Sequence, residues 1–202
     1  MTRRTGICFL LLLLSSIVTA DVFVRDDIIT NPVYHRFSVC QEHTCQQVVT
    51  VSLSRAEWNE ITLPIQEPLP VASEERAAIA ATISNMEAIV GQRTGTYLDK
   101  GGNFAGFGQP GQMDCIDEST NTTTYITMLA EQNMLLHHTV EDRATRFGIF
   151  AGAPHTTAVI RENSSGHLYA VDSWFFDNGV QPVIIDLPEW KSGWTPADDP
   201  HE

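Results

Sequence analysis

The chain is poor in basic residues. It carries 12 lysines and arginines against 25 aspartates and glutamates, which gives a formal net charge of −13. A surface of that sign repels the phosphate backbone of nucleic acids and anionic lipid headgroups, so we expect neither as a partner. The chain also lacks a phosphate-binding loop, because the glycine-rich stretch 101–111 has neither the following lysine nor the preceding strand. We expect no cofactor.

Long apolar runs are scarce as well, and the longest one lies at the N-terminus. Arg3 and Arg4 precede the apolar run 7–17, and Val18-Thr19-Ala20 offers small residues for cleavage before Asp21. This pattern predicts a signal peptide over residues 1–20. The run is too short to span a bilayer and no later run is longer, so we expect no stable membrane insertion after cleavage. The mature protein is expected in the periplasm or outside the cell.

Cysteine is the third scarce residue. Of four cysteines, Cys8 leaves with the signal peptide, while Cys40 and Cys45 stand at the two ends of a short loop. Disulfides persist in exported proteins, so we predict that Cys40 and Cys45 pair. Cys115 is then left unpaired in an oxidising compartment, where a free thiol is exposed to oxidation.

A zinc site is the alternative interpretation of the two loop cysteines. Together with His35 and His43 they supply two thiols and two imidazoles within eleven residues. The spacing Cys-x2-His-x-Cys is not common in zinc fingers, however. We therefore favour the disulfide and predict no metal site.

The hydrophobic pattern predicts an α+β fold, in which strands come first, then helices, then strands again. Residues 21–70 are expected to form an N-terminal β-hairpin and a proline-rich connector that precede the main domain, residues 71–202. The expected strands are 34–40, 45–53, 156–160, 167–171 and 182–187, and the expected helices are 54–58, 73–90 and 115–136.

Three residues suggest catalysis. Cys115 is predicted at the start of a helix with Asp114 as N-cap, where the helix dipole and unpaired N–H groups favour a thiolate and an oxyanion. His155 and Asp172 fall on two strands around the turn 163–166, which should bring them face to face. The histidine would act as general base and the aspartate would orient it. Asp177 and Asn178 are rivals for the orienting role.

Other residues close to Cys115 in the sequence have two interpretations each. Gln109 and Gln112 are candidates for a second oxyanion donor, although both could be solvated loop residues. Asp117 and Glu118 complement the helix dipole, and if they lie near the sulfur they oppose its ionisation. A buried, inert thiol is the plain alternative for Cys115.

The residues around these positions resemble transglutaminase-like cysteine peptidases. The stretch Gly111–Glu118 is similar to that superfamily's Gly-Asp-Cys-x-Asp signature, with Gln112 and Met113 intervening, and the stretches Pro154–Ile160 and Tyr169–Asp172 resemble its histidine and aspartate strands. The resemblance covers about residues 75–187 and indicates a distant branch. It implies a papain-like core, a catalytic helix packed on an antiparallel sheet, and catalytic roles for Cys115, His155 and Asp172.

The resulting hypothesis is an exported cysteine-dependent hydrolase or acyltransferase that acts on peptide or other amide bonds, with a peptide or protein as substrate. One alternative is a non-enzymatic binding module that retains the fold. Another is a cell-wall peptidase of the NlpC/P60 type, suggested by Asp114-Cys115, but that family usually has Ser-Gly after the cysteine where this chain has Ile116-Asp117.

Overall fold

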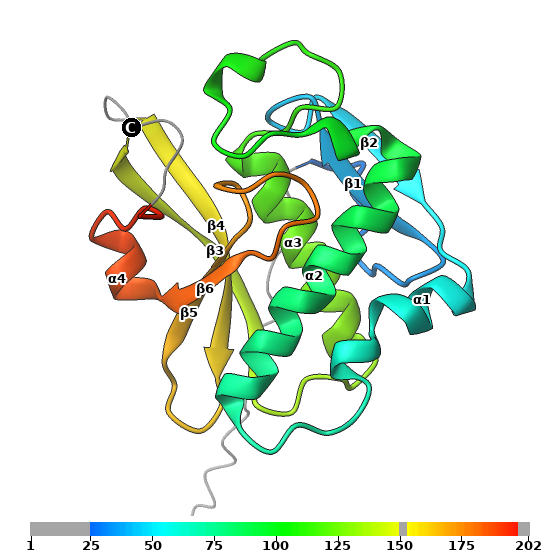
Figure 1. Ribbon diagram of the computed structural model, residues 1–202, viewed down its shortest axis with the longest axis vertical. Helices are drawn as coiled ribbons and strands as arrows, with labels where there is room; N and C mark the ends of the chain where they lie inside the picture. The colour runs from blue at the N-terminus through cyan, green and yellow to red at the C-terminus, as the bar shows by residue number, and fades with distance from the viewer. Residues whose placement is uncertain (1–24, 150–152, 198–202) are drawn as a thin grey trace, which may run out of the picture.

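Two antiparallel sheets enclose a pair of helices in the computed structural model of the protein, which describes residues 25–149 and 153–197 (Figure 1). The smaller sheet contains β1 (Phe37–Gln41) and β2 (Gln47–Val51). The larger sheet has the order β3-β4-β5-β6 and contains β3 (His138–Ile149), β4 (Ala153–Glu162), β5 (Leu168–Asp172) and β6 (Val183–Asp186). The helices are α1 (Arg55–Ile61), α2 (Ala72–Thr94), α3 (Cys115–Glu131) and α4 (Leu187–Lys191). The architecture agrees with the expected α+β class.

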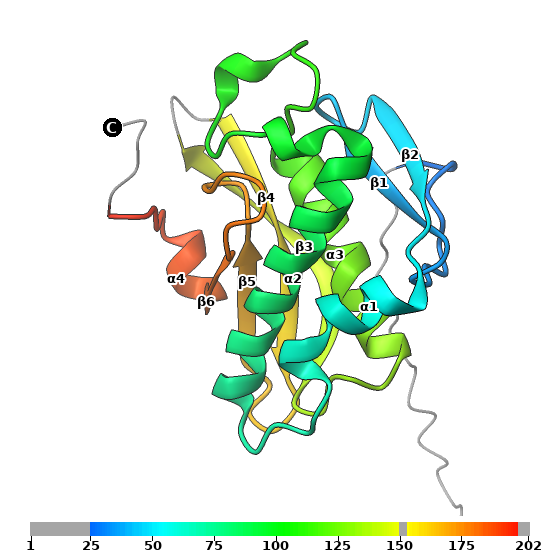
Figure 2. The same cartoon turned by 45° about the vertical axis from the view of Figure 1, so that its right-hand side comes forward.

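Helix α3 lies at the centre of the molecule, between the two sheets (Figure 2). One face of the larger sheet packs against α3, and α2 lies beside α3. The other face of that sheet is covered by the short helix α4, whose Leu187 and Trp190 pack on Val159 and Ala170. The middle of the larger sheet is therefore covered on both faces, and residues on alternate positions of β4 face α3 and α4 in turn.

The N-terminal hairpin and the rest of the chain share one hydrophobic core. Phe37, Trp58, Ile79, Ile126 and Ile160 are all buried in the same cluster, although they come from β1, α1, α2, α3 and β4. The hairpin is also tied to α3 by polar contacts. The Asn121 amide donates to the Cys40 carbonyl at 2.9 Å and accepts from the Cys40 N–H at 2.7 Å. The hairpin is thus held at a fixed position against the helix that begins with Cys115.

The hairpin loop is one residue longer than expected. The predicted loop was 41–44, whereas Gln41 still pairs with Gln47 and the loop comprises residues 42–46. Glu42, His43, Thr44 and Cys45 all have positive φ, between 52° and 65°. Cys45 therefore lies in the loop and not on the strand, and it forms the predicted disulfide with Cys40.

Both long helices end at places other than those predicted. Helix α2 continues past Gly91 to Thr94, and Gly95 ends it with a φ of 89°. Gly91 serves a different purpose, since a Cβ there would lie 2.6 Å from Asn178 Oδ1 and 2.9 Å from the Tyr97 nitrogen. Helix α3 ends at Glu131, five residues before the predicted end, and Asn133 follows with a positive φ of 55°.

Strand β3 was missed by the sequence analysis, which placed His138 at a helix end. Its polar residues and two register irregularities against β4 obscure the alternation that marks a strand. Within the part of the chain that the structure describes, no helix has the length and apolar character needed to cross a membrane.

Candidate functional site

Cys115 is the first residue of α3, as predicted. Asp114 caps the helix by accepting hydrogen bonds from the Ile116 and Asp117 N–H groups, both at 3.0 Å, and Asp117 returns the contact by accepting from the Asp114 N–H at 3.2 Å. This reciprocal capping box fixes the start of the helix. Among the described residues Cys115 is the cysteine outside a disulfide, and its side chain is only partly buried.

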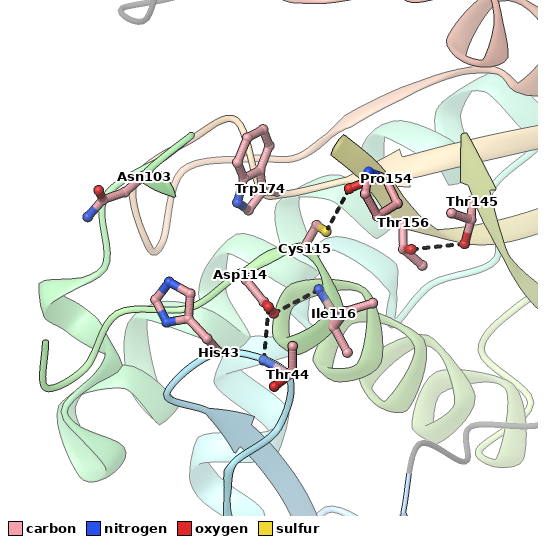
Figure 3. A pocket seen from close by; sticks show the side chains of 10 residues that line it. All are labelled: His43, Thr44, Asn103, Asp114, Cys115, Ile116, Thr145, Pro154, Thr156 and Trp174. Carbon is pink, nitrogen blue, oxygen red and sulfur yellow. Dashed lines mark hydrogen bonds between the residues drawn. The ribbon is translucent and has the colours of Figure 1, made fainter. Parts of the chain in front are cut away.

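The Cys115 side chain lines a cavity of about 410 Å³ at the start of α3 (Figure 3). The cavity lies between α3, β4 and two loops, one from the hairpin and one from the stretch 98–114. Its lining residues are His43, Thr44, Asn103, Asp114, Cys115, Ile116, Thr145, Pro154, Thr156 and Trp174. A cavity of this size accommodates a small molecule or a few residues of a peptide.

The thiol contacts the backbone of β4 on either side of His155. The sulfur lies 4.0 Å from the Pro154 carbonyl oxygen, to which the S–H can donate (Figure 3), and it accepts from the Thr156 N–H. Burial, together with the negative charges of Asp114 and Asp172, raises the pKa of Cys115 to about 12. In this arrangement the thiol is neutral at physiological pH.

His155 and Asp172 form a buried pair, as their strand positions predicted. Imidazole Nε2 lies 2.6 Å from Asp172 Oδ2, and both residues are 2% exposed. The same carboxylate oxygen accepts from the Trp190 indole N–H at 2.6 Å, and Oδ1 accepts from the Trp174 N–H at 3.3 Å. Since the carboxylate occupies Nε2, any proton exchange with a substrate or a thiol falls to Nδ1.

The His155 ring lies among aromatic side chains on the α4 side of the sheet. It shares the strand face of Val159, and its centroid lies 4.8 Å from that of Trp174 and 5.4 Å from that of Trp190. His155 does not line the cavity, and within the described residues it makes no hydrogen bond with the Cys115 sulfur. The structure thus joins His155 to Asp172 and places the thiol beside the His155 backbone, without a sulfur–imidazole contact.

The two oxyanion candidates do not reach the cavity. Gln112 is buried, where its amide donates to the Leu98 carbonyl at 2.6 Å and its Oε1 accepts from the Asn103 amide at 2.6 Å. Gln109 is exposed, and neither side chain is among those that line the cavity. Gln112 therefore organises the loop that leads to Cys115.

The rival orienting residues are also placed elsewhere. Asp177 binds the Lys100 ammonium at 2.5 Å and the Gly101 N–H at 3.1 Å, and Asn178 lies against Gly91 of α2. Asp172 is the acid that meets His155.

The hairpin loop is bound to the same helix start by its backbone. The Thr44 N–H donates to Asp114 at 2.9 Å, and the N–H groups of His43 and Cys45 donate to Asp117, the latter at 2.6 Å. Successive N–H groups in left-handed backbone make a concave site for an anion, here the two carboxylates. Asp114, predicted as the N-cap, and Asp117, predicted to complement the helix dipole, thus also attach the loop to α3.

A group of buried acids lies beneath the helix start. Glu87 of α2, Asp99 and Glu118 of α3 are each at most 4% exposed, and Asp99 accepts from the Met113 N–H at 2.7 Å. Burial raises the pKa of Glu87 to about 8 and that of Asp99 to about 7, and raises that of Glu118 well above its ordinary value. Near neutral pH these acids are therefore at least partly protonated, which limits the negative charge buried beneath the helix start.

Two contributions to the site were missed from sequence. Trp190 was expected only in a tail that might fold back, but its indole holds Asp172. His43 was considered only as a metal ligand, but it lines the cavity. The disulfide occupies both loop sulfurs, so they are not available as thiolate ligands for zinc. Comparisons of the chain with protein-family models, with curated proteins and with solved structures found no match.

Proposed function

We propose that the protein is an exported, cysteine-dependent hydrolase or acyltransferase that acts on peptide or other amide bonds. The observation that carries this proposal is the buried His155–Asp172 pair on β4 and β5, together with a free thiol at a helix start that contacts the β4 backbone next to His155. A helix bearing the cysteine, packed on an antiparallel sheet that bears the histidine and the aspartate, also supports a distant transglutaminase-like core.

The proposed chemistry assigns one step to each group. His155 Nδ1 takes the thiol proton, and the sulfur attacks the amide carbonyl carbon. Asp172 stabilises the imidazolium through Nε2, and His155 then returns the proton to the leaving amine. Water or an acceptor amine releases the acyl group from the sulfur. The N–H of Cys115, which bonds its own sulfur in the resting form, is the oxyanion donor at the helix start, since those of Ile116 and Asp117 bind Asp114.

The resting thiol must move for this reaction. Its present partners are backbone groups of β4, and the His155 ring lies on the α4 side of the sheet, so a rotation about the Cα–Cβ bond of Cys115 has to be accompanied by a movement of the His155 ring toward the cavity. Catalytic hydrogen bonds are often long in enzymes without substrate and shorten in the substrate complex. The neutral thiol seen here is then the resting form.

Selective alkylation and matched variants test the proposal. Iodoacetamide should modify Cys115 of the native protein, and Cys115→Ala should abolish hydrolysis or acyl transfer on a library of peptide amides. The melting temperature of Cys115→Ala should stay nearly unchanged because the side chain lines a cavity. Alkylation that requires denaturant, or turnover that survives in Cys115→Ala, would falsify the proposal.

A non-enzymatic binding module is the second candidate. The missing sulfur–imidazole contact and the raised pKa of Cys115 favour it. The rate of alkylation against pH separates the two functions. A binding module predicts a rate that rises only toward the thiol pKa of about 12 and does not respond to His155→Ala. The enzyme predicts additional reactivity near neutral pH that His155→Ala removes.

A further inference from the structure

His43 is a buried histidine without a hydrogen-bond partner for its side chain. It is 6% exposed, and neither Nδ1 nor Nε2 has a partner within the described structure. Buried polar groups are hydrogen-bonded in the great majority of cases, so two unpaired nitrogens on one ring require an explanation. His43 also lines the cavity that contains the Cys115 sulfur (Figure 3).

The backbone of His43 is fixed relative to Cys115. Its N–H is bound by Asp117, the next residue along is bound by Asp114, and Asp114 directly precedes Cys115. The disulfide between Cys40 and Cys45 closes the same loop. The loop keeps four consecutive residues at positive φ, a conformation that is unfavourable for side chains other than glycine. Such backbone persists where surrounding contacts determine it, and it is concentrated at functional sites.

One aromatic side chain packs against the imidazole. The Phe107 ring meets the His43 ring edge to face, with centroids 5.4 Å apart, and Phe107 is itself 69% exposed. Phe107 stands between Gly106 and Gly108 in the glycine-rich loop, and Gly108 has a φ of 76° with open space around it. Movement of this exposed side chain does not disturb the core, so a ligand can displace it from His43.

We propose that His43 is a substrate-binding residue of the Cys115 cavity and hydrogen-bonds peptide groups of the substrate. This inference rests on the proposed function and deepens it, because it assigns the substrate to peptides. A neutral imidazole has one donor and one acceptor, which match a carbonyl and an N–H of a peptide backbone. A ligand supplies the missing partners, and the unfavourable burial of two unpaired nitrogens in the free protein is relieved on binding.

The test uses a protein that cannot turn over. The Cys115→Ala variant, labelled with ¹⁵N-histidine, is titrated with an acetyl-capped alanine dipeptide N-methylamide and separately with acetate. The dipeptide should shift the His43 ring nitrogens in a saturable way, and acetate should not. In the Cys115→Ala background, His43→Phe should weaken dipeptide binding at least about tenfold by Trp fluorescence. The matched control is His35→Phe, which alters an exposed histidine of the same hairpin region and should leave the affinity unchanged.

Thermal unfolding supplies the second measurement. Because His43→Phe keeps a flat aromatic ring and removes two unpaired nitrogens, its melting temperature should equal or exceed that of the parent protein. A clear fall would show that the nitrogens have a partner in the folded protein and would overturn the proposal. A response of His43 to acetate alone, unchanged dipeptide affinity in His43→Phe, or no dipeptide binding would also overturn it. If only the enzymatic function fails, the native protein binds the dipeptide through His43 but Cys115 forms no acyl adduct.

Discussion

Two buried histidine–carboxylate pairs stand at opposite ends of the same two strands, and they differ in what surrounds them. His155 pairs with Asp172 near the start of β4, and His138 pairs with Glu75 at the start of β3, where His138 is paired in register with Glu162 at the end of β4. The first pair has a nitrogen–oxygen distance of 2.6 Å and the second 2.9 Å, and both are almost fully buried. Distance and burial therefore do not separate them.

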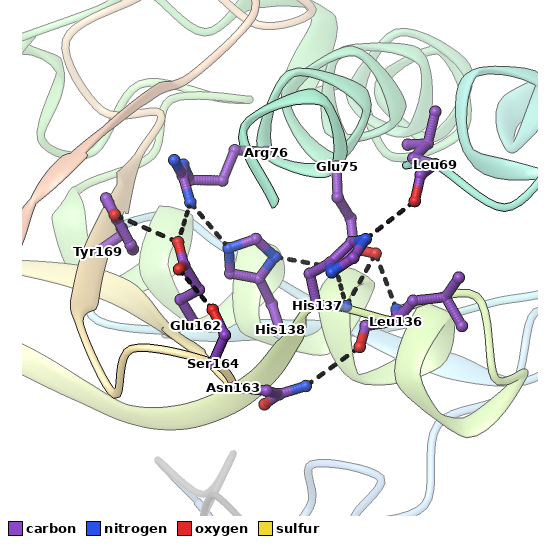
Figure 4. Close-up of polar contacts among 10 residues, drawn as sticks. All are labelled: Leu69, Glu75, Arg76, Leu136, His137, His138, Glu162, Asn163, Ser164 and Tyr169. Atoms are coloured by element: carbon purple, nitrogen blue, oxygen red, sulfur yellow. Dashed lines mark hydrogen bonds and ion pairs between the residues drawn. The ribbon is translucent and has the colours of Figure 1, made fainter. Parts of the chain in front are cut away.

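The second nitrogen of the His138 ring has a partner as well. His138 Nε2 lies 3.2 Å from the Arg76 guanidinium, which also binds Glu162 at 2.8 Å (Figure 4). The guanidinium can only donate, so His138 Nε2 accepts from Arg76 while Nδ1 donates to Glu75. Both of its nitrogens are occupied.

Glu75 has a further structural task, because it accepts the N–H groups of Leu136 and His137 at 2.8 to 3.1 Å (Figure 4). It thereby fixes the segment between α3 and β3. A buried histidine–acid pair is thus no evidence of catalysis by itself. A thiol beside the strand and an adjoining cavity are what distinguish the His155 pair.

The largest difference between the pairs is expected in turnover. Asp172→Asn should lower kcat by about 10⁴-fold, because the amide no longer stabilises the imidazolium or selects its tautomer. Glu75→Gln should leave kcat unchanged. The measurement is kcat on one amide substrate for both variants, with folding checked by circular dichroism. Equal losses in the two variants would remove the distinction.

The second difference is expected in stability. Glu75→Ala leaves the His138 ring and two backbone N–H groups without their acceptor, and should lower the free energy of unfolding by about 3–5 kcal/mol. Glu74→Ala, at the exposed neighbouring position, is the control and should change it by less than about 0.5 kcal/mol. Urea unfolding measures both. If Glu75→Ala changes the free energy of unfolding as little as Glu74→Ala does, the Glu75–His138 pair does not stabilise the fold.

The features of these two regions that could be predicted from the sequence are those that depend on residues close together in the chain. Cys115, Asp114 and the antiparallel approach of His155 to Asp172 were predictable because capping and hairpin geometry are local. The contact between Cys40 and Cys45 was predictable for the same reason. None of these local patterns shows the direction in which the His155 ring points.

The remaining features depend on contacts between distant parts of the chain. Glu75 meets His138 across 63 residues, and Asp117 meets Cys45 across 72. No local pattern marks an acid as the partner of a loop N–H group. The positive φ values of residues 42–45 were equally hidden, because none of the four residues is glycine. Strand β3 was missed since its irregular register breaks the alternation of polar and apolar residues.

The two ends of the molecule should also respond to pH in opposite ways. Burial raises the pKa of Glu87 to about 8, so the folded state loses stability as pH rises from the ordinary value of 4.5 toward 8. The hydrogen bonds from His138, Leu136 and His137 outweigh the burial of Glu75 and lower its pKa, so its contribution is present above the ordinary value and is lost as pH falls.

The measurement that separates the two contributions is urea unfolding at pH 5 and pH 8. Between pH 5 and pH 8, the free energy of unfolding of the unionisable variant Glu87→Gln should fall by about 3 kcal/mol less than that of the parent protein. Glu75→Gln, tested in the same way, should leave the loss between pH 5 and pH 8 nearly unchanged, since Glu75 is ionised throughout. A parent protein that is equally stable at both pH values would contradict the assignment of buried, protonated acids beneath Cys115.

The smallest expected effect concerns the disulfide between Cys40 and Cys45 in the hairpin loop beside the cavity. The sequence separation of Cys40 and Cys45 is five residues, and closing so short a loop stabilises the folded state by about 2 kcal/mol. In urea unfolding, the free energy of unfolding of the double variant Cys40→Ser/Cys45→Ser should fall by about this amount, whereas that of Cys115→Ser should change little. Because the carboxylates of Asp114 and Asp117 still bind the loop, its left-handed backbone should be retained. The ¹⁵N shifts of His43 report on that backbone, and a change in them comparable to unfolding would show that the disulfide, and not the helix start, holds the loop over the cavity.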